Sequence, residues 1–216
     1  MAADGTGVSA IPEDLAAQLN AILHADGQAV LQPEAALRFG SYGALLLKWN
    51  ARMNLTAVRD VEGILRRHFA ESIRCVRALP GGIRTLLDLG SGAGFPGIPI
   101  ALCRPEIEVT LAESQTKKAA FLREAARRLA LTAHVHAGRA ETLGQRFECV
   151  TLRAVDKMAG AVRVGAELVM PGGWLALLTT GTEADGLKAL AGGFDWSLAP
   201  AAIGGAERIL VLGRRV

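Results

Sequence analysis

The chain has 216 residues, half of them hydrophobic and 21% charged, so it can bury the core of one sizeable domain. No apolar run reaches the roughly 18–20 residues of a membrane span, and residues 1–10 lack the basic and apolar segments of a secretory signal. The formal net charge of +3 allows a nucleic-acid partner without requiring one.

The cysteines Cys75, Cys103 and Cys149 are odd in number, widely spaced and set in apolar surroundings. This usage suits reduced, packed thiols better than disulfide bonds or a metal site. We therefore expect a cytoplasmic protein that holds no metal ion.

Residues 1–10 are expected to form a disordered lead, and residues 11–80 an N-terminal helical extension. Pro12 followed by acidic residues marks the start of a helix, and a second helix begins at about Pro33. A third helix is predicted by the helical spacing of the apolar residues at positions 61, 64, 65, 69, 73 and 76.

From residue 81 onward, short apolar runs alternate with helical segments. The predicted strands cover residues 85–89, 107–113, 133–137, 148–153 and 172–180, with one or two more strands within 201–215. The predicted helices begin at about 97 and cover 115–130 and 156–169. This alternation indicates right-handed βαβ units and a mostly parallel sheet with helices on both faces, so residues 81–216 are expected to form a doubly wound α/β domain.

The first predicted strand leads into "DLGSGAGFPGIP", a turn in which Gly90, Gly92 and Gly94 follow Asp88. In a doubly wound sheet, a glycine-rich turn at this place lets a nucleotide-like ligand approach the backbone. A dinucleotide site requires G-x-G-x-x-G, but Phe95 stands where the last glycine would be. A carboxylate of Asp88 facing the ligand would suit the cationic S-adenosylmethionine better than a pyrophosphate. The turn therefore favours a methyltransferase over a nicotinamide oxidoreductase.

The second predicted strand ends at Glu113, nineteen residues after Gly94. A carboxylate at this strand tip can accept hydrogen bonds from both ribose hydroxyls of an adenosine ligand, in either chemistry. The alternative is that the glycines form only a tight turn and that Glu113 caps the next helix.

Two later turns extend the expected pocket. "GRAET" places Ala140 and Glu141 beside the adenine of such a ligand, and "TLRAVD" ends the fourth strand at Arg153, nearest the methyl donor. Taken locally, Arg153 could equally be a surface charge, and Glu141 could be an acid at a helix start.

With these residues identified, the chain resembles the bacterial 16S ribosomal RNA guanine-N7 methyltransferases, the family called RsmG or GidB. The segments that carry the resemblance, in the order of the family, are "WNARMNLTAV", "HFAESI", "LLDLGSGAGFPGIPIAL", "ESQTKKAAFL", "GRAE" and "RAV". The pairing of "NLTA" with "GAGFPGIP" is far more specific than a generic methyltransferase loop.

The resemblance implies a class I S-adenosylmethionine-dependent methyltransferase fold with an N-terminal helical extension. It implies methylation of N7 of one guanine in the decoding region of 16S rRNA. The cofactor contacts of the family fall on Gly90, Phe95, Ala140, Glu141 and Arg153. Including the residues reasoned from the pattern, the expected cofactor-binding set is Asp88, Gly90, Gly92, Phe95, Glu113, Ala140, Glu141 and Arg153.

Two positions depart from the family. Glu113 stands where the ribose-binding acid is usually aspartate, so the hydroxyl geometry is open. Leu152 stands where a small residue is common, which could change how tightly Arg153 is held.

Guanine N7 carries a lone pair in the ring plane and has no proton to lose, so we expect no general base and name no catalytic residue. His68, His134 and His136 are expected to be structural or surface histidines.

RNA must be held by positive charge and by contacts to exposed bases. The expected RNA-binding residues are Lys117, Lys118, Arg123, Arg139 and Asn54, and Lys117 is expected to lie nearer the pocket than the rest of its helix. Further arginines could either join this surface or be solvated helix charges: Arg66, Arg67, Arg127 and Arg128. Asn54 could instead cap the third helix, as could Thr56.

The expected partner is 16S rRNA or the small ribosomal subunit, without a membrane, and the protein is expected to be a monomer. Two alternatives stay open: a methyltransferase for another RNA, and a non-catalytic RNA-binding assembly factor with the same fold.

Overall fold

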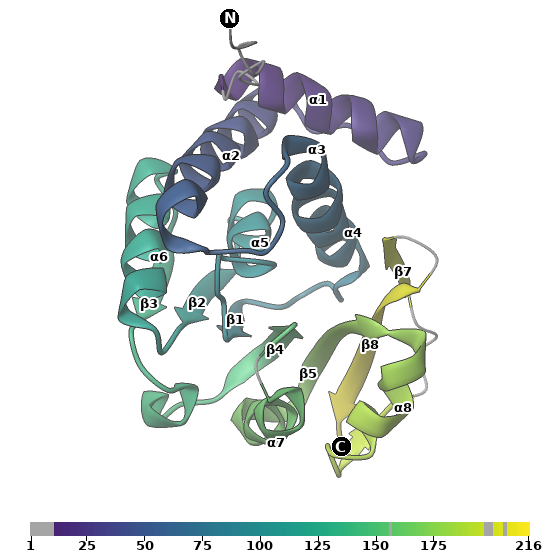
Figure 1. Cartoon of the computed structure of the whole chain (residues 1–216). Helices are drawn as coiled ribbons and strands as arrows, with labels where there is room; N and C mark the ends of the chain where they lie inside the picture. The colour runs from purple at the N-terminus through teal and green to yellow at the C-terminus, as the bar shows by residue number, and fades with distance from the viewer. Residues whose placement is uncertain (1–10, 156, 197–200, 205–206) are drawn as a thin grey trace, which may run out of the picture.

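The computed structural model describes residues 11–155, 157–196, 201–204 and 207–216 (Figure 1). The disordered lead expected over residues 1–10 lies outside the described residues. Within the described part of the chain, no helix is both long enough and apolar enough to cross a membrane.

The three helices predicted before residue 80 are present. They are α1 (Pro12–Ala25), α2 (Pro33–Met53) and a continuous run made of α3 (Val61–Ile64), η1 (Leu65–Ala70) and α4 (Glu71–Ala78). The middle piece, η1, is π-helical. Pro12 and Pro33 occupy the first position of their helices, where the missing N–H of proline has no intrahelical partner to lose.

The remaining elements alternate between strand and helix, as the pattern predicts. The strands are β1 (Thr85–Leu89), β2 (Glu108–Ala112), β3 (Ala133–His136), β4 (Phe147–Arg153), β5 (Val169–Thr180), β6 (Phe194–Asp195), β7 (Ala201–Gly204) and β8 (Arg208–Arg215). The helices are α5 (Gly97–Cys103), α6 (Thr116–Arg128), η2 (Ala140–Leu143), α7 (Met158–Leu168) and α8 (Gly181–Lys188).

Among the described residues, the strands form one sheet in the order β3-β2-β1-β4-β5-β8-β6, with β7 also paired to β8. The first five strands of that order are parallel, and β8 runs antiparallel to β5. The chain moves outward from β1 to β3 and then returns to place β4 on the other side of β1. Such a switch point opens a crevice at the carboxyl ends of the two central strands.

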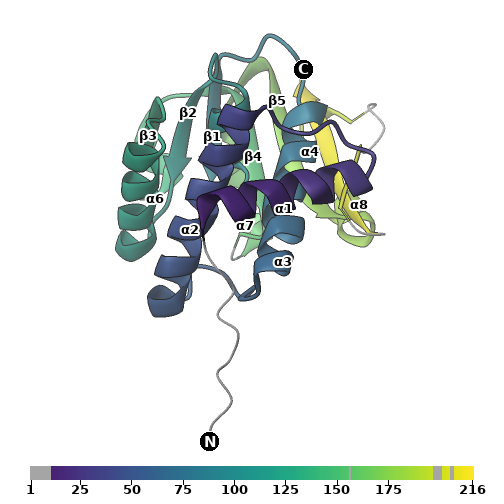
Figure 2. The same cartoon turned by 90° about the horizontal axis from the view of Figure 1, so that it is seen from above.

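The two faces of the sheet carry separate hydrophobic cores because side chains alternate along each strand. Leu86 points to the face covered by α4, α5 and α6, and α1 and α2 pack on the outside of these helices and of η1. Leu87 points to the opposite face, which α7 and α8 cover. Figure 1 shows α4 and α5 on one side of the sheet and α7 and α8 on the other, and Figure 2 shows α1 lying across α2. The helices α1 to α4 with η1 are called the helical segment below.

Three details differ from the prediction, and the first is the two-residue strand β6, which pairs with β8 and was not predicted. The helix α8 was not predicted, because its sequence is polar and contains two glycines; it is stabilised by buried Ala184 and by Glu183, which accepts hydrogen bonds from the hydroxyls of Thr179 and Thr180. The strand β5 begins at Val169 instead of 172, because Val169 already pairs with Phe147 of β4.

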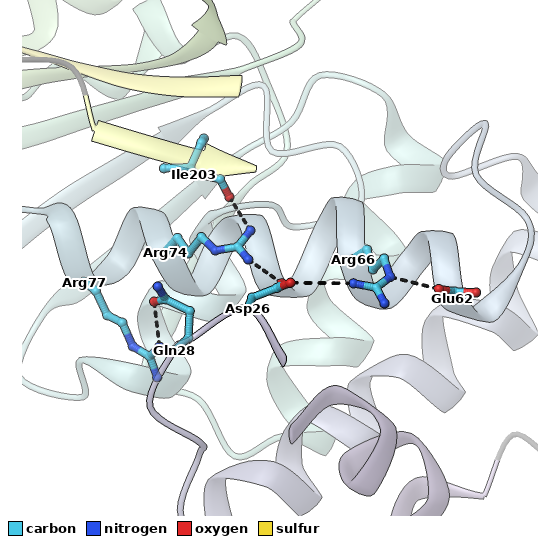
Figure 3. A network of polar contacts seen from close by, with 7 residues as sticks. All are labelled: Asp26, Gln28, Glu62, Arg66, Arg74, Arg77 and Ile203. Atoms are coloured by element: carbon cyan, nitrogen blue, oxygen red, sulfur yellow. Dashed lines mark hydrogen bonds and ion pairs between the residues drawn. The ribbon is translucent and has the colours of Figure 1, made fainter. Parts of the chain in front are cut away.

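A polar network fastens the end of α1 to the rest of the molecule (Figure 3). Asp26 accepts a hydrogen bond from Arg74 of α4 and lies 3.8 Å from Arg66 of η1. Arg74 also donates to the carbonyl of Ile203 in β7 at 3.0 Å. The network therefore joins the N-terminal helix to the C-terminal edge of the sheet.

Candidate active site

A cavity of about 760 Å³ lies at the carboxyl ends of β1, β2 and β4, at the switch point of the sheet. This volume is typical of sites for small ligands and cofactors. Its wall includes the glycine turn, the tip of β2, the η2 turn and the end of β4, together with residues 55–57 and His68 from the helical segment.

The three glycines of the turn all have positive φ, namely 71° for Gly90, 56° for Gly92 and 91° for Gly94. A Cβ on Gly90 would meet Val155 at 2.9 Å, and one on Gly94 would meet the hydroxyl of Tyr42 at 2.8 Å. At Gly92, the nearest atom to a Cβ would be the carbonyl oxygen of Gly90, at 3.8 Å. Gly92 therefore faces open cavity, where a ligand can come close to the backbone.

Glu113 is buried at the tip of β2 and lines the cavity. Its Oε2 accepts a hydrogen bond from the N–H of Gly92 at 3.0 Å, and its Oε1 accepts one from Gln115 at 2.8 Å. Each carboxylate oxygen can accept a further bond. The carboxylate is therefore oriented by the glycine turn and by the start of α6, and it can still receive two ligand hydroxyls.

The structure corrects the expectation for Asp88, whose carboxylate does not line the cavity. Asp88 is 1% exposed and lies on the α5 face of β1, where it accepts hydrogen bonds from the N–H of Gly97 at 3.1 Å and from the hydroxyl of Thr151 at 2.9 Å. Burial raises the pKa of this carboxyl from 3.8 to about 6. Its place in the structure is to tie β1 to β4 and to the start of α5.

Phe95 lines the cavity from a buried aromatic cluster. Its ring lies 5.2 Å from Tyr42, 5.4 Å from Phe69 and 4.9 Å from His68, with the imidazole stacked at 21°. The hydroxyl of Tyr42 donates to the carbonyl of Ala93 in the glycine turn. Tyr42 was missed by sequence reasoning, because a tyrosine on the apolar face of a helix is typical of a core residue.

Arg153 lines the cavity and is not a surface charge, since its side chain is only 9% exposed. It forms an ion pair with Glu71 at 3.0 Å and donates to the hydroxyl of Ser72 and to the carbonyl of Arg67. Burial raises the pKa of Glu71, and the positive charge of Arg153 opposes that rise. Glu71 was also missed, although it stands in the "HFAESI" segment.

His68 connects to the same group. Arg153 Nη2 lies 3.2 Å from His68 Nδ1, and His68 Nε2 lies 2.7 Å from the hydroxyl of Thr56. Burial, reinforced by the positive charge of Arg153, lowers the pKa of His68 to about 3, so the imidazole is neutral at physiological pH. His68 is structural, as predicted, but it lies in the wall of the cavity.

The η2 turn brings Ala140 and Glu141 to the wall of the cavity, with Arg139 beside them. Ala140 is buried, and the side chains of Glu141 and Arg139 are exposed and 4.0 Å apart. His136 supports this turn through contacts to the carbonyl of Arg139 and the hydroxyl of Thr142.

The basic residues of α6 divide differently from the prediction. Lys118 lines the cavity and Lys117 does not, because consecutive helical residues are about 100° apart around the axis. Arg123 is exposed. Arg127 and Arg128 both pair with Glu124, so they are engaged in surface ion pairs.

Arg66 is similarly engaged, with Glu62 at 2.9 Å and Asp26 at 3.8 Å (Figure 3). Arg67 is exposed, while its carbonyl accepts from Arg153. His134 pairs with Glu108 at 3.0 Å on the surface.

Asn54 does not line the cavity, and the suggestion that it caps the third helix is wrong. It ends α2 in the left-handed conformation at φ 48°, which asparagine tolerates better than most residues, and its side chain accepts from Arg59. The cap of α3 is Asp60, which accepts from the N–H of Gly63. Thr56 is likewise not that cap.

Asn50 is the buried asparagine that organises this loop. Its side chain accepts from the N–H of Thr56 at 2.9 Å and donates to the carbonyl of Val58 at 3.1 Å. Sequence reasoning missed it, although "WNARMNLTAV" contains both asparagines.

The cysteines are free, as expected from the sequence. Burial raises the pKa of the Cys103 thiol to about 11 and that of Cys75 to about 12, so both are inert thiols at neutral pH.

The fold is similar to that of solved methyltransferases. A methyltransferase from Pyrococcus furiosus aligns with a TM-score of 0.59 at 15% identity and covers 82% of this chain and 96% of its own. The structure of PigF with SAH aligns with a TM-score of 0.55 at 20% identity and covers 68% and 56%. At these identities the likeness shows the class I methyltransferase fold alone.

Sequence comparison is more specific. A protein named ribosomal RNA small subunit methyltransferase G from Xanthomonas campestris pv. campestris (strain B100) is 43% identical over 170 residues, which are 77% of this chain and 78% of that protein. The protein of the same name from Xanthomonas oryzae pv. oryzae (strain MAFF 311018) is 47% identical over 137 residues, or 62% and 64%. The profile of the family described as rRNA small subunit methyltransferase G matches residues 36–193. The chain therefore belongs to the rRNA small subunit methyltransferase G family.

Proposed function

We propose that this protein transfers the methyl group of S-adenosylmethionine to N7 of a guanine in the decoding region of 16S rRNA. The observation that carries the proposal is the carboxylate of Glu113, held by the N–H of Gly92 at the edge of a cavity in a member of this methyltransferase family. The site and nucleobase follow from the family resemblance, and they are what the experiment must test.

The residues of the cavity fit S-adenosylmethionine. Glu113 would accept the ribose hydroxyls, because its two oxygens keep free lone pairs, and Ala140 with Glu141 would contact the adenine. Gly92 leaves room for the ligand beside the backbone. Phe95 and Arg153 would form the end of the site near the reacting methyl group. When bound, S-adenosylmethionine supplies an electrophilic methyl group on a sulfonium.

The reaction requires alignment and little proton transfer. The lone pair of guanine N7 forms the new N–C bond while the S–C bond breaks, which leaves S-adenosylhomocysteine and a cationic 7-methylguanine. No proton leaves the base, so no general base is required. His68 agrees with this, since it is neutral and both of its ring nitrogens are engaged within the protein. Positioning of the two reactants alone can lower the activation free energy by about 7–11 kcal/mol.

The RNA would approach over the basic rim of the cavity. Lys118 and Arg139 line the opening, and Lys117 and Arg123 extend the positive charge along α6. Phosphate contacts of this kind position the RNA without reading its sequence. We also propose that the protein works in the cytoplasm as a monomer.

The decisive experiment is mass mapping of 16S rRNA after incubation of small ribosomal subunits or naked rRNA with the protein and S-adenosylmethionine. A new 7-methylguanine in the decoding region would support the proposal. Methylation of a different RNA, or binding to rRNA without methylation, would replace it with one of the two alternatives. Calorimetry with S-adenosylmethionine and with NAD separates the methyltransferase from a nicotinamide enzyme.

A further inference from the structure

A chain of polar side chains crosses the wall of the cavity between β4 and the loop that follows α2. It runs from Glu71 through Arg153 and His68 to Thr56, with successive contacts of 3.0, 3.2 and 2.7 Å. Glu71 and Arg153 are buried, and Thr56 is half-buried at the cavity surface. The chain therefore transmits the orientation of a buried ion pair to a hydroxyl in the cavity wall.

The backbone around that hydroxyl is also held in place. Buried Asn50 accepts from the N–H of Thr56 and donates to the carbonyl of Val58, so it grips the loop on both sides of Ala57. Leu55 and Ala57 line the cavity together with Thr56. A loop with both ends fixed by one buried amide offers a preorganised surface to a ligand.

The direction of each hydrogen bond follows from the chemistry of the donors. We assign the ring proton of His68 to Nε2, because Nη2 of Arg153 can only donate and lies 3.2 Å from Nδ1; Nη2 also donates to the carbonyl of Arg67 and to Glu71. Nε2–H then donates to the oxygen of Thr56, which also accepts from the N–H of Val58 at 3.2 Å. The lowered pKa of His68 agrees with a single ring proton.

The hydroxyl of Thr56 thus accepts two hydrogen bonds, which occupy both of its lone pairs. With this tautomer of His68, the proton of Thr56 points to a third partner, and none of the described residues accepts it. Since Thr56 lines the cavity, this proton is a fixed donor offered to whatever occupies that part of the cavity.

We propose that the hydroxyl of Thr56 donates a hydrogen bond to O6 of the target guanine and so distinguishes guanine from adenine. The inference rests on the proposed function. Guanine presents two acceptors side by side, N7 and O6, whereas adenine presents N7 beside an N6 amino donor. A hydroxyl donor beside the methylated N7 therefore favours guanine, whose O6 accepts the hydrogen bond. With adenine, the hydroxyl and the N6 amino group would both be donors and would face each other without an acceptor.

The position of Thr56 supports the base over the cofactor as its partner. The residues proposed for the adenosine, Glu113 and Ala140, come from β2 and η2. Thr56 instead joins the β4 end of the cavity through His68 and Arg153, on the other side of β1.

The test pairs two substitutions with two substrates. Thr56→Val removes the hydroxyl and keeps the shape, and Thr56→Ser keeps the hydroxyl. The substrate is small-subunit rRNA ligated from a transcript and a synthetic oligonucleotide that carries guanine or 2-aminopurine at the methylated position. 2-Aminopurine keeps N7 and the 2-amino group but lacks O6.

We expect the ratio of kcat/KM for guanine over 2-aminopurine to be about tenfold larger in the wild type than in Thr56→Val, the size of one hydrogen bond. Thr56→Ser should keep the wild-type ratio. The Kd of S-adenosylmethionine should stay within about twofold in both variants. A merely structural role would lower both rates equally and leave the ratio unchanged, since the intrinsic reactivity of each base cancels in the comparison.

Three outcomes would overturn the inference: an unchanged ratio in Thr56→Val, a lost ratio in Thr56→Ser, or a weakened Kd of S-adenosylmethionine with the ratio intact. The last result would assign the hydroxyl to the cofactor. If Thr56→Val fails to fold, Thr56→Cys keeps the shape with a much weaker donor and should show a reduced ratio. A wild-type protein that methylates no guanine would refute the proposed function itself, which is a separate result.

Discussion

The hydroxyl of Tyr42 offers the sharpest test of how the helical segment supports the candidate site. Tyr42 lies on α2, is fully buried, and donates to the carbonyl of Ala93 inside the glycine turn. Tyr42→Phe removes that one donor. The aromatic contacts at 5.1 Å to Phe69 and 5.2 Å to Phe95 involve the ring and are retained.

The expected free-energy cost of Tyr42→Phe follows from the carbonyl oxygen of Ala93, which loses its hydrogen-bond donor. Ala93 is 7% exposed, so its carbonyl would lose a partner away from bulk water. An unpaired buried acceptor costs about 1–3 kcal/mol. If the glycine turn relaxes to rehydrate the carbonyl, the same free energy appears as weaker cofactor binding, which corresponds to a rise in Kd of about 5- to 150-fold.

Two measurements separate stability from binding. Urea unfolding without ligand gives the loss of stability, and calorimetry with S-adenosylmethionine gives the Kd. The control is Phe39→Leu, a substitution on the same helix of a residue that packs on Phe69 and has no contact with the turn among its described ring contacts. It should cost about 1–2 kcal/mol of stability with an unchanged Kd. If Tyr42→Phe also leaves the Kd unchanged, the hydrogen bond of Tyr42 only stabilises the fold and does not support cofactor binding.

Three further predictions concern the carboxylates and the basic helix. Glu113→Ala should weaken S-adenosylmethionine by about 1–3 kcal/mol in calorimetry, because ligand hydroxyls and the N–H of the turn lose their acceptor, while RNA affinity stays the same. The raised pKa of Asp88, about 6 against an ordinary 3.8, means that the folded state prefers the protonated carboxyl. Its stabilising contribution is therefore complete below about pH 4 and is lost as the pH rises to about 6 and above. Relative to Asp88→Asn, the wild type should lose about 3 kcal/mol of unfolding free energy over that range, measured by urea unfolding in a pH series. Replacement of Lys117, Lys118 and Arg123 by glutamine should weaken RNA binding and reduce the log–log salt slope by about 0.7–0.9 for each lost phosphate contact.

The control for Glu113→Ala is the substitution of another glutamate, Glu148. Glu148 also accepts backbone N–H bonds, from Arg84 and Thr85 at the far end of β1, so Glu148→Ala should cost stability and leave the cofactor Kd unchanged. Should both glutamate variants bind S-adenosylmethionine like the wild type, Glu113 does not contact the ribose.

For Asp88, a stability difference that does not vary with pH would show that the carboxyl titrates normally. The asparagine variant should also keep its affinity for S-adenosylmethionine, because Asp88 lies outside the cavity wall. For α6, the control is the double change of Arg127 and Arg128 to glutamine, since both already pair with Glu124. An equal effect of the two sets on the salt slope would place the RNA elsewhere.

The local pattern of the sequence was enough to predict most of the secondary structure and several residues that line the candidate cavity. Alternation of apolar runs with helical spacing identified β1 to β5 and the helices α5, α6 and α7 between them, because periodicity depends only on neighbours along the chain. The glycines of the turn and Glu113 were likewise found from spacing, since strand tips of a parallel sheet meet at one edge. The helix α8 escaped because its polar sequence carries no such period.

What a side chain faces was decided by the tertiary structure. Asp88 and Leu89 are adjacent in sequence, yet Asp88 turns to the α5 face and Leu89 lines the cavity, because successive residues of a strand point to opposite faces. Lys117 and Lys118 differ for the corresponding reason on a helix. The contacts of Tyr42 with Ala93, and of Arg153 with Glu71, join residues 51 and 82 positions apart. Only the packing of the helical segment on the sheet brings such pairs together, and no local pattern in the chain records it.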